Sequence, residues 1–357
     1  MNSYHIIGLM SGTSLDGVDV AYCRFDSTGN QTWTFEIIHT AGYEYPDSLL
    51  KQLKQATELP SEALYSLNKQ LGIHFGEVVN QFLFNTKIDP MKIDAVASHG
   101  QTVFHQPENG FTLQIGCGTN LAVTCGIPVI NDFRSKDIAL GGQGAPLVPI
   151  GDQLLFSQLA DSFLNIGGFC NASFTGSSPI KAFDICAGNL PLNQLMEQHY
   201  QLNYDSNGEK ARSGTIHTPI LNQLNELDFY TTNGPKSLGT EWLFDQFMPL
   251  LDIDISPEHQ LATVVEHIAT QVAHTLTKNG SKKVLVTGGG AKNIFLIERI
   301  QSKFEGALLL PSSELIDFKE AIVFGFLGAL YLAGENNVLS SVTGAMKSSR
   351  GGILHTP

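Results

Sequence analysis

The stretch GLMSGTSLDGVD, residues 8–19, begins inside one apolar segment, 5–9, and ends inside a second, 18–25. Both segments are predicted to be strands, and segment 33–38 a third, so that short turns join them into an antiparallel meander. Glycines allow a backbone to come close to a bulky anion, on which successive N–H groups and hydroxyls then converge. The turn therefore fits either a phosphate-binding loop or an ordinary hairpin that needs glycine and aspartate for its geometry.

The plan of this first half recurs in the second half of the chain. Two helical patterns and two strands follow the opening meander, at 47–56, 61–84, 95–98 and 128–131. The second half has three strands and three helical patterns, and then a strand, a helix, a strand and a last helix, at 162–166, 172–175, 180–183, 190–199, 241–250, 257–278, 284–287, 293–304, 307–310 and 319–330. Because each half opens on a strand that runs into a glycine turn, these patterns predict a duplicated α/β fold with a cleft between the halves.

We predict two domains. The first covers residues 1–134 and has the C-terminal tail, about 340–357, packed on it, while the second covers residues 135–339. Within the second domain, residues 204–238 are polar and rich in turn-forming residues. This segment is expected to be a loop insertion, which could serve as a lid.

Composition and charge exclude several classes of protein. Of the 357 residues, 42% are hydrophobic and only 15% are charged, which allows a substantial core and is not typical of a disordered chain. The net charge of −13 disfavours binding to nucleic acid or to anionic membranes. Five cysteines, an odd number without a CxxC pair, argue against a disulfide scaffold or a zinc site. The start does not resemble a signal peptide and no apolar run is long enough to span a membrane, so we expect a soluble, cytoplasmic protein.

Two further glycine turns follow predicted strands, at Gly167-Gly168 and at Gly288-Gly289-Gly290. They could bind phosphates and a nucleoside, or they could only allow close packing of helix on strand. Asp184 stands at the predicted end of strand 180–183. There it is suited either to act as a general base in the cleft or to cap the helix that follows Gly188.

Arg134 comes directly after another predicted strand. Its guanidinium could hold an anionic group of a substrate, such as a carboxylate, through two parallel hydrogen bonds. It could equally form a surface ion pair with Asp132 or Asp137. The following segment 141–149, GGQGAPLVP, combines flexible glycines with rigid prolines, and we expect it to be a shaped substrate loop or a hinge.

Metal ligands are not evident in the sequence. His99 and His105 lie in a predicted loop, but no third ligand stands at the spacing that zinc requires. Recognition of hydroxyl groups or a structural role fits these histidines better. Asp16, in the first glycine turn, could orient a hydrated Mg²⁺.

Taken together, these residues resemble the anhydro-N-acetylmuramic acid kinase family. The likeness extends over nearly the whole chain, and its motifs occur in the order found in the family. The matching segments are GLMSGTSLDGVD at 8–19, HGQTVFH at 99–105, DFR at 132–134, GGQGAPLVP at 141–149, NIGG at 165–168, PKS at 235–237, GGGA at 288–291 and EA at 320–321. One departure follows Asp184, where the family has Thr-Gly-Pro-Gly-Asn and this chain has ICAGN.

The resemblance implies a duplicated actin-like (ribonuclease H-like) ATPase fold with two domains around a central cleft. It also implies that 1,6-anhydro-N-acetylmuramic acid, ATP and water are converted to N-acetylmuramic acid 6-phosphate and ADP, a step of peptidoglycan recycling and amino sugar metabolism. ATP and Mg²⁺ are the implied cofactors, and a homodimer is possible. Two alternatives stay open: a kinase for a different anhydro or simple sugar, which needs no contact with a lactyl carboxylate, and a non-catalytic ATP-binding regulator of the same fold.

Individual roles also follow from the resemblance. Asp184 matches the catalytic aspartate, which would deprotonate the attacking water as the base of an inverting glycosidase does. Thr102, Arg134 and Glu320 match residues near the sugar. The residues expected to bind ATP, from the resemblance for the first eight and from the glycine turns for the others, are Gly12, Thr13, Ser14, Leu15, Asp16, Gly17, Val18, Asp19, Gly167, Gly168, Gly288, Gly289 and Gly290.

Overall fold

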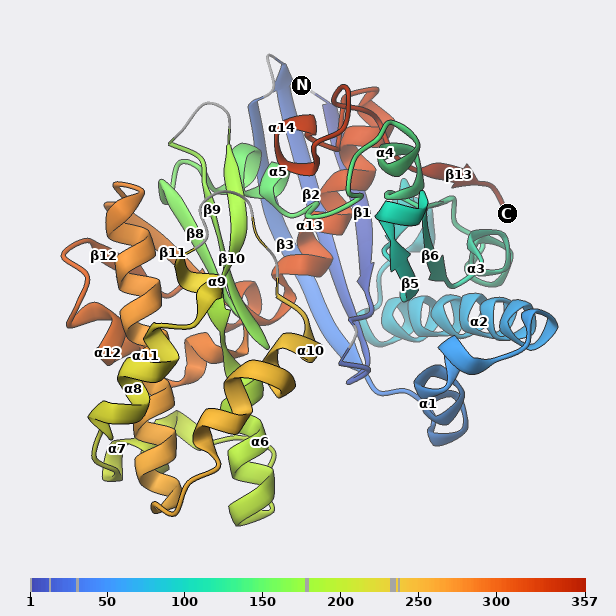
Figure 1. Ribbon diagram of the computed structural model, residues 1–357. Coiled ribbons are helices and arrows are strands. Elements are labelled where there is room, and N and C mark those ends of the chain that lie inside the picture. The colour runs from blue at the N-terminus through green and yellow to red at the C-terminus, as the bar shows by residue number, and fades with distance from the viewer. Residues whose placement is uncertain (1, 13, 30–31, 177–179, 232–235, 237) are drawn as a thin grey trace. The chain divides into compact units, whose positions relative to one another are not determined.

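The computed structural model describes residues 2–12, 14–29, 32–176, 180–231, 236 and 238–357 (Figure 1). The chain divides into two compact units, which are described one at a time. Unit 1 consists of residues 1–155 and 318–357, and unit 2 of residues 156–317.

This division differs from the predicted domains, because residues 135–155 and 318–339 group with unit 1. Packing against the last long helix explains the difference. A Cβ placed on Gly151 would lie 2.6 Å from the side chain of Val323, so the chain at 149–151 packs tightly against that helix.

The sheet of unit 1 has six strands in the order β13-β7-β4-β1-β2-β3. The strands β1, β2 and β3 are antiparallel neighbours, as the sequence predicts, whereas β4 runs parallel to β1 and β7 parallel to β4. The C-terminal strand β13 pairs with β7 in antiparallel register, which fixes the end of the chain to this sheet. The six strands are β1 (Asn2–Met10), β2 (Val18–Gly29), β3 (Thr32–Tyr43), β4 (Ala95–Ser98), β7 (Val129–Asn131) and β13 (Ile353–His355).

Helices cover both faces of this sheet, since its strands alternate apolar side chains on the two sides. On one face Ile7 and Leu9 enter a core with helices α1 (Asp47–Lys54), α2 (Ser61–Thr86) and α3 (Gly118–Cys125). On the other face lies α13 (Ser313–Ala333), which begins in unit 2 and mostly belongs to unit 1. There the backbones nearly touch, because a Cβ on Gly8 would lie 1.9 Å from the carbonyl oxygen of Ala321.

The loop predicted around His99 to His105 instead contains a strand, β5 (Gln101–Gln106), which forms a two-stranded hairpin with β6 (Phe111–Ile115). The side chains of Phe104 and Phe111 meet across it. The remaining helices of unit 1 are short: α4 (Ser135–Ala139), α5 (Pro149–Gly151) and α14 (Ser340–Thr343).

The sheet of unit 2 repeats the plan, with five strands in the order β10-β9-β8-β11-β12. Three antiparallel strands are again followed by two parallel ones. This repetition confirms the predicted duplicated actin-like (ribonuclease H-like) fold. The strands are β8 (Ser162–Ile166), β9 (Phe169–Phe174), β10 (Lys181–Ala187), β11 (Lys283–Thr287) and β12 (Ala307–Leu309).

The segment 204–238 is not the loop that its composition predicts. It contains three short helices, and the apolar residues Ala211, Ile220 and Leu224 enter the core of unit 2 together with α11. Because polar residues separate these positions, the composition of the segment does not indicate its partly buried helices. The helices of unit 2 are α6 (Asn189–Tyr200), α7 (Glu209–Ser213), α8 (Thr218–Asn225), α9 (Asp228–Thr231), α10 (Thr240–Trp242), α11 (Pro257–Lys278) and α12 (Ile294–Gln301).

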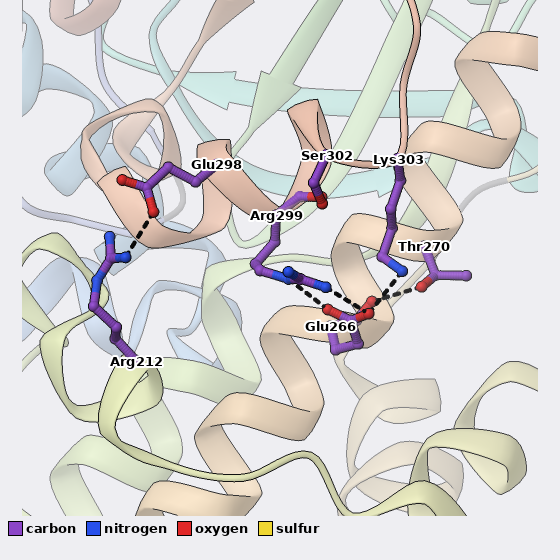
Figure 2. A network of polar contacts seen from close by, with 7 residues as sticks. All are labelled: Arg212, Glu266, Thr270, Glu298, Arg299, Ser302 and Lys303. Carbon is purple, nitrogen blue, oxygen red and sulfur yellow. Dashed lines mark hydrogen bonds and ion pairs between the residues drawn. The ribbon is translucent and has the colours of Figure 1, made fainter.

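A nearly buried carboxylate ties α11 to α12 (Figure 2). Glu266 accepts hydrogen bonds from Arg299, at 2.8 and 3.0 Å, and its oxygen lies 2.6 Å from Lys303 Nζ. Burial alone would raise the pKa of Glu266, but these two cations outweigh burial and lower it. On the outside of α12, Arg212 of α7 pairs with Glu298 at 2.7 Å. These ion pairs therefore hold helices α7, α11 and α12 together.

In the described parts of the chain, no helix combines the length and the apolar character needed to cross a membrane.

Candidate active site

The first glycine turn connects β1 to β2 in unit 1, and Met10 pairs with Asp19 at its base. It is therefore a hairpin loop, which does not exclude phosphate binding. Ser14 Oγ donates to Asp16 Oδ1 at 2.9 Å. Leu15 has φ of 57°, a left-handed conformation that is uncommon for a leucine and is often found at functional loops. Thr13 lies outside the described residues.

The ends of this loop are buried or hydrogen-bonded, whereas among the described residues the space beside Gly12 is free of protein atoms other than Ser14 Oγ. Val18 is fully buried in the core, so it supports the loop but exposes no surface to a ligand. The buried Ser11 hydroxyl contacts both the hydroxyl of Tyr45 and the amide oxygen of Gln101. A Cβ on Gly12 would meet only Ser14 Oγ, at 3.4 Å, whereas one on Gly17 would lie 2.5 Å from a backbone oxygen of β3. Gly12 thus leaves more room for a ligand than Gly17 does.

Arg134 is hydrogen-bonded within unit 1 and does not form the surface ion pair considered from the sequence. Its Nη2 lies 2.9 Å from His99 Nε2, and its Nη1 donates to the carbonyl of Gly144 at 2.7 Å. Burial lowers the pKa of Arg134 to about 10, so the guanidinium remains charged at neutral pH. Asp137, the other partner considered, accepts instead from Gly144 N–H at 2.8 Å and from the hydroxyl of Thr343 at 2.8 Å.

Glu320 is the acidic counterpart of Arg134 in unit 1. Its side chain keeps an exposed surface on α13, yet desolvation raises its pKa. The charges of Arg134 and Lys319 act against that rise, and the charge of Asp16 adds to it. The two substrate candidates and the first glycine turn therefore share one electrostatic environment.

Thr102 lies on β5 with a half-buried side chain. Its hydroxyl accepts a hydrogen bond from Gln114 Nε2 at 3.3 Å. Thr102 is also three residues from His99, the partner of Arg134.

In unit 2, Asp184 lies within β10 and not at its end, so the predicted position is wrong by part of a strand. It does not cap the next helix either, because Gly188 holds that position. A register shift between Asp184 and Cys186 distorts the strand here. Backbone groups of Lys236 and Leu238 lie beside it: Asp184 N–H donates to Lys236 O at 2.9 Å, and Leu238 N–H donates to Asp184 Oδ2 at 2.8 Å.

Burial raises the pKa of Asp184, and the hydrogen bond from Leu238 acts in the opposite direction. A carboxylate with a raised pKa that is still held by a donor is a suitable proton acceptor. The sequence alone does not indicate the part played by Leu238, because an apolar side chain gives no sign of a backbone N–H that binds a carboxylate.

The glycine turns after β8 and β11 lie together at one end of the sheet of unit 2. Asn189 Nδ2 donates to Ile166 O at 3.2 Å, and Asn189 N–H donates to Gly167 O at 2.8 Å. A Cβ on Gly288 would lie 2.5 Å from Asn165 Oδ1, and Gly288 has φ of 83°. The structure thus brings the predicted turns into one cluster.

The glycines of this cluster fall into two groups. The space beside Gly168, Gly288 and Gly290 is filled by protein atoms, so close packing alone explains why they are glycines. By contrast, a Cβ on Gly167 would meet nothing closer than 3.5 Å, and one on Gly289 nothing closer than 3.8 Å. These two leave room for a ligand to reach the backbone.

An apolar hollow of about 500 Å³ adjoins the glycine turn that follows β11. Ala291, Ile294 and Leu308 are among the residues that line it. Among the described residues, no group of three or more His, Cys, Asp or Glu side chains could hold a metal ion.

The duplicated strand order, with glycine turns after β1, β8 and β11, is that of the actin-like (ribonuclease H-like) fold. The family model for anhydro-N-acetylmuramic acid kinase matches residues 4–356, and the chain belongs to this family.

Curated relatives named anhydro-N-acetylmuramic acid kinase are similar over their full length. The chain is 35% identical to the protein of Sulfurovum sp. (strain NBC37-1), with 98% of each chain covered. It is also 35% identical to that of Haemophilus influenzae, with 97% of this chain and 96% of the relative covered. Among solved structures, component A of the (R)-2-hydroxyglutaryl-CoA dehydratase of Acidaminococcus fermentans is 12% identical over 93% of this chain and 100% of that one, with a TM-score of 0.49.

Proposed function

We propose that this chain is an ATP-dependent kinase that opens 1,6-anhydro-N-acetylmuramic acid with water and phosphorylates its O6. The products are N-acetylmuramic acid 6-phosphate and ADP, which places the reaction in peptidoglycan recycling and amino sugar metabolism. The observation that carries the proposal is the family match over residues 4–356, together with full-length relatives that bear the same name.

Asp184 is the proposed catalytic base. Water attacks the anomeric carbon, and one water proton passes to the Asp184 carboxylate. The bond from the anomeric carbon to O6 breaks, and O6 forms a bond to the γ-phosphorus of ATP while the bond to the ADP oxygen breaks. Because the phosphoryl group captures O6, no separate acid is needed to protonate the leaving oxygen. The raised pKa of Asp184 suits this role, since it makes the carboxylate a better proton acceptor.

The candidates for binding ATP phosphates are backbone N–H groups of the glycine turns, taken in each unit by itself. In unit 1 they are those of Gly12 to Asp19, apart from the buried Val18, and in unit 2 those of the turns at Gly167 and at Gly289. Amides aimed at a transferring phosphoryl group stabilise the charge that develops on it. The nucleoside would lie by Ala291, where the apolar hollow offers a surface for the base.

The residues present also fit a magnesium ion that arrives with ATP. Mg²⁺ is usually held by one or two carboxylates plus phosphate oxygens and waters, so a cluster of three acidic ligands is not required. Asp16 is exposed in the first turn, close enough to Glu320 to influence its pKa, and is the proposed holder. When bound, the ion would neutralise charge on the phosphates.

The sugar would contact Thr102, Arg134 and Glu320 in unit 1. Arg134 is suited to the lactyl carboxylate that distinguishes muramic acid from glucosamine, because its charged guanidinium can donate two parallel hydrogen bonds. We place the reaction in the cytoplasm, where ATP is available. A homodimer stays a prediction.

The substitution Asp184→Asn tests the proposal, because it keeps the size of the side chain and removes the base. We expect purified wild-type protein with Mg-ATP to release ADP only when anhydro-N-acetylmuramic acid is added. The Asn variant should lose about a thousandfold in kcat and still bind ATP. The matched control is Asp254→Asn, at an exposed acid of unit 2.

Three results would contradict parts of the proposal. Full activity of the Asn variant would remove Asp184 from the role of base. Turnover of other anhydrosugars, but not of the muramic one, would identify a kinase of different specificity. ATP binding without turnover of any sugar would point to a regulator.

A further inference from the structure

His99 is a buried imidazole that the proposed reaction does not use directly. It follows β4 in unit 1 and is only 7% exposed. Its ring packs edge-on against Phe324, with the ring centres 4.7 Å apart. Since Phe324 lies one helical turn after Glu320 on α13, the imidazole is braced by the helix that carries a substrate candidate.

Hydrogen bonds assign the protonation state of His99. Its Nδ1 lies 2.8 Å from the carbonyl oxygen of Gly100 and 3.3 Å from that of Ser11. Carbonyl oxygens only accept, so Nδ1 carries the hydrogen and Nε2 is left bare as an acceptor. Burial lowers the pKa of His99 to about 3, and the charge of Arg134 acts in the same direction. The ring is therefore neutral at physiological pH.

The bare Nε2 of His99 receives Arg134. Both Arg134 Nη2, at 2.9 Å, and Arg134 Nε, at 3.3 Å, donate to it, while Nη1 donates to Gly144 O. A guanidinium has five N–H bonds. These contacts use three of them and leave one on each terminal nitrogen, the number that a carboxylate accepts in a two-point contact.

A neutral acceptor has a consequence that an acidic one would not have. An aspartate or glutamate in this place would fix Arg134 but would also neutralise it. Imidazole fixes the guanidinium and leaves its full charge for an incoming anion. The one acid close enough to affect it, Glu320, influences Arg134 through its charge, and no hydrogen bond between the two is found among the described residues.

We propose that His99 is a positioning residue for the sugar: it orients Arg134 toward the substrate carboxylate and, through Ser11, ties that orientation to the first glycine turn. The inference rests on the proposed function, because the carboxylate is that of the lactyl group. His99 acts through Arg134 and does not touch the reacting atoms.

Two substitutions of His99 by amide residues, and one double variant, test this role. His99→Asn keeps a donor for Gly100 and cannot reach Arg134, whereas His99→Gln places an acceptor near the position of Nε2. We expect His99→Asn to raise the KM for anhydro-N-acetylmuramic acid about tenfold, with a much smaller change in kcat and in the KM for ATP. His99→Gln should recover most of the loss. The control is His39→Asn, at an exposed histidine of the same unit.

The energetic coupling between His99 and Arg134 distinguishes a positioning role of His99 from a merely structural one. If His99 acts through Arg134, then His99→Asn should change the sugar KM little in an Arg134→Gln background. Equal effects in both backgrounds would overturn the proposal, as would an unchanged KM in a folded His99→Asn variant. A wild-type protein that fails to turn over the sugar would instead reject the proposed function.

The protonation state can be tested without substrate. Nitrogen-15 NMR of the labelled full chain should show His99 with a protonated Nδ1 and a bare Nε2 from pH 5 to pH 8. A His99 ring that titrates near pH 6.5 would overturn its assignment as a neutral acceptor.

Discussion

Asp184 and His99 show how a single backbone group or ring nitrogen can define a site. Asp184 is half-buried in β10, and among the described residues the donor to its carboxylate is the N–H of Leu238. His99 is held by two carbonyls and in turn holds Arg134. In both cases the residue type could be recognised from the sequence, but the partner could not. Leu238 N–H, Ser11 O and the Arg134 side chain are brought close by tertiary structure, and the names of Asp184 and His99 say nothing about them.

The substitution Leu238→Pro tests the hydrogen bond that the Leu238 N–H donates to Asp184. Proline has no N–H, so the ionised carboxylate loses a hydrogen bond that lowers its pKa, and the pKa of Asp184 should rise further. A base works when deprotonated, so kcat/KM falls as the pH drops through that pKa. We expect the acidic limb of the pH profile to move to higher pH. Leu238→Ala keeps the N–H, and its limb should stay where the wild-type limb lies. A limb that moves equally in both variants would show that the side chain, and not the N–H, is responsible.

At the scale of elements, the sequence predicts buried and strongly periodic segments well. The strands β4 and β8 and the long helix α11 have the predicted bounds: the two strands are short, almost fully buried runs, and the helix has a buried, periodic apolar face. The hairpin β5–β6 is not predicted, since its short strands mix apolar with polar residues and lie apart from both main sheets. The helices within 204–238 were missed because they are short and mostly solvated, and only a few positions such as Ile220 reach the core.

Close contact of β1 with α13 leads to a prediction about stability. A methyl group on Gly8 would lie 1.9 Å from Ala321 O and 2.8 Å from Gly325 N, both of them backbone atoms that cannot move aside alone. We therefore expect Gly8→Ala to destabilise the protein by about 3 kcal/mol, measured by denaturant unfolding. In Gly42→Ala the added methyl meets only an aspartate oxygen at 3.6 Å, an ordinary contact. An equal loss of stability in the two variants would contradict the packing explanation.

At the scale of the whole molecule, the duplicated plan could be predicted and its boundaries could not. Glycine turns after strands mark the start of each half, and the structure confirms this repetition. The chain passes from unit 1 to unit 2 after Leu155 and returns at Phe318, inside α13. Sequence periodicity gives no sign of a boundary inside a continuous helix, because both parts of the helix have the same pattern. Only the partners on which each part packs distinguish them.

Each unit contains a buried neutral histidine, which predicts how the stability of the whole chain depends on pH. Burial lowers the pKa of His99 in unit 1 and of His267 in unit 2 to about 3. In the unfolded chain both should titrate near 6.5, so below that pH the unfolded state binds more protons and is favoured. The free energy of unfolding should fall as the pH drops from 6.5 toward 3, by about 2 kcal/mol per histidine at pH 5.

His267 separates this effect from general acid denaturation. Its Nε2 lies 2.9 Å from Tyr230 OH and its Nδ1 lies 2.8 Å from Asn225 Oδ1, so His267→Asn should lower the stability at pH 7. The same variant has no imidazole to protonate, and its loss of stability between pH 6.5 and 4 should be smaller than that of the wild type, as measured by urea unfolding at several pH values. His199→Asn, at an exposed histidine of unit 2, should keep the wild-type slope. If His267→Asn also keeps that slope, the burial of His267 does not contribute to the acid sensitivity of the molecule.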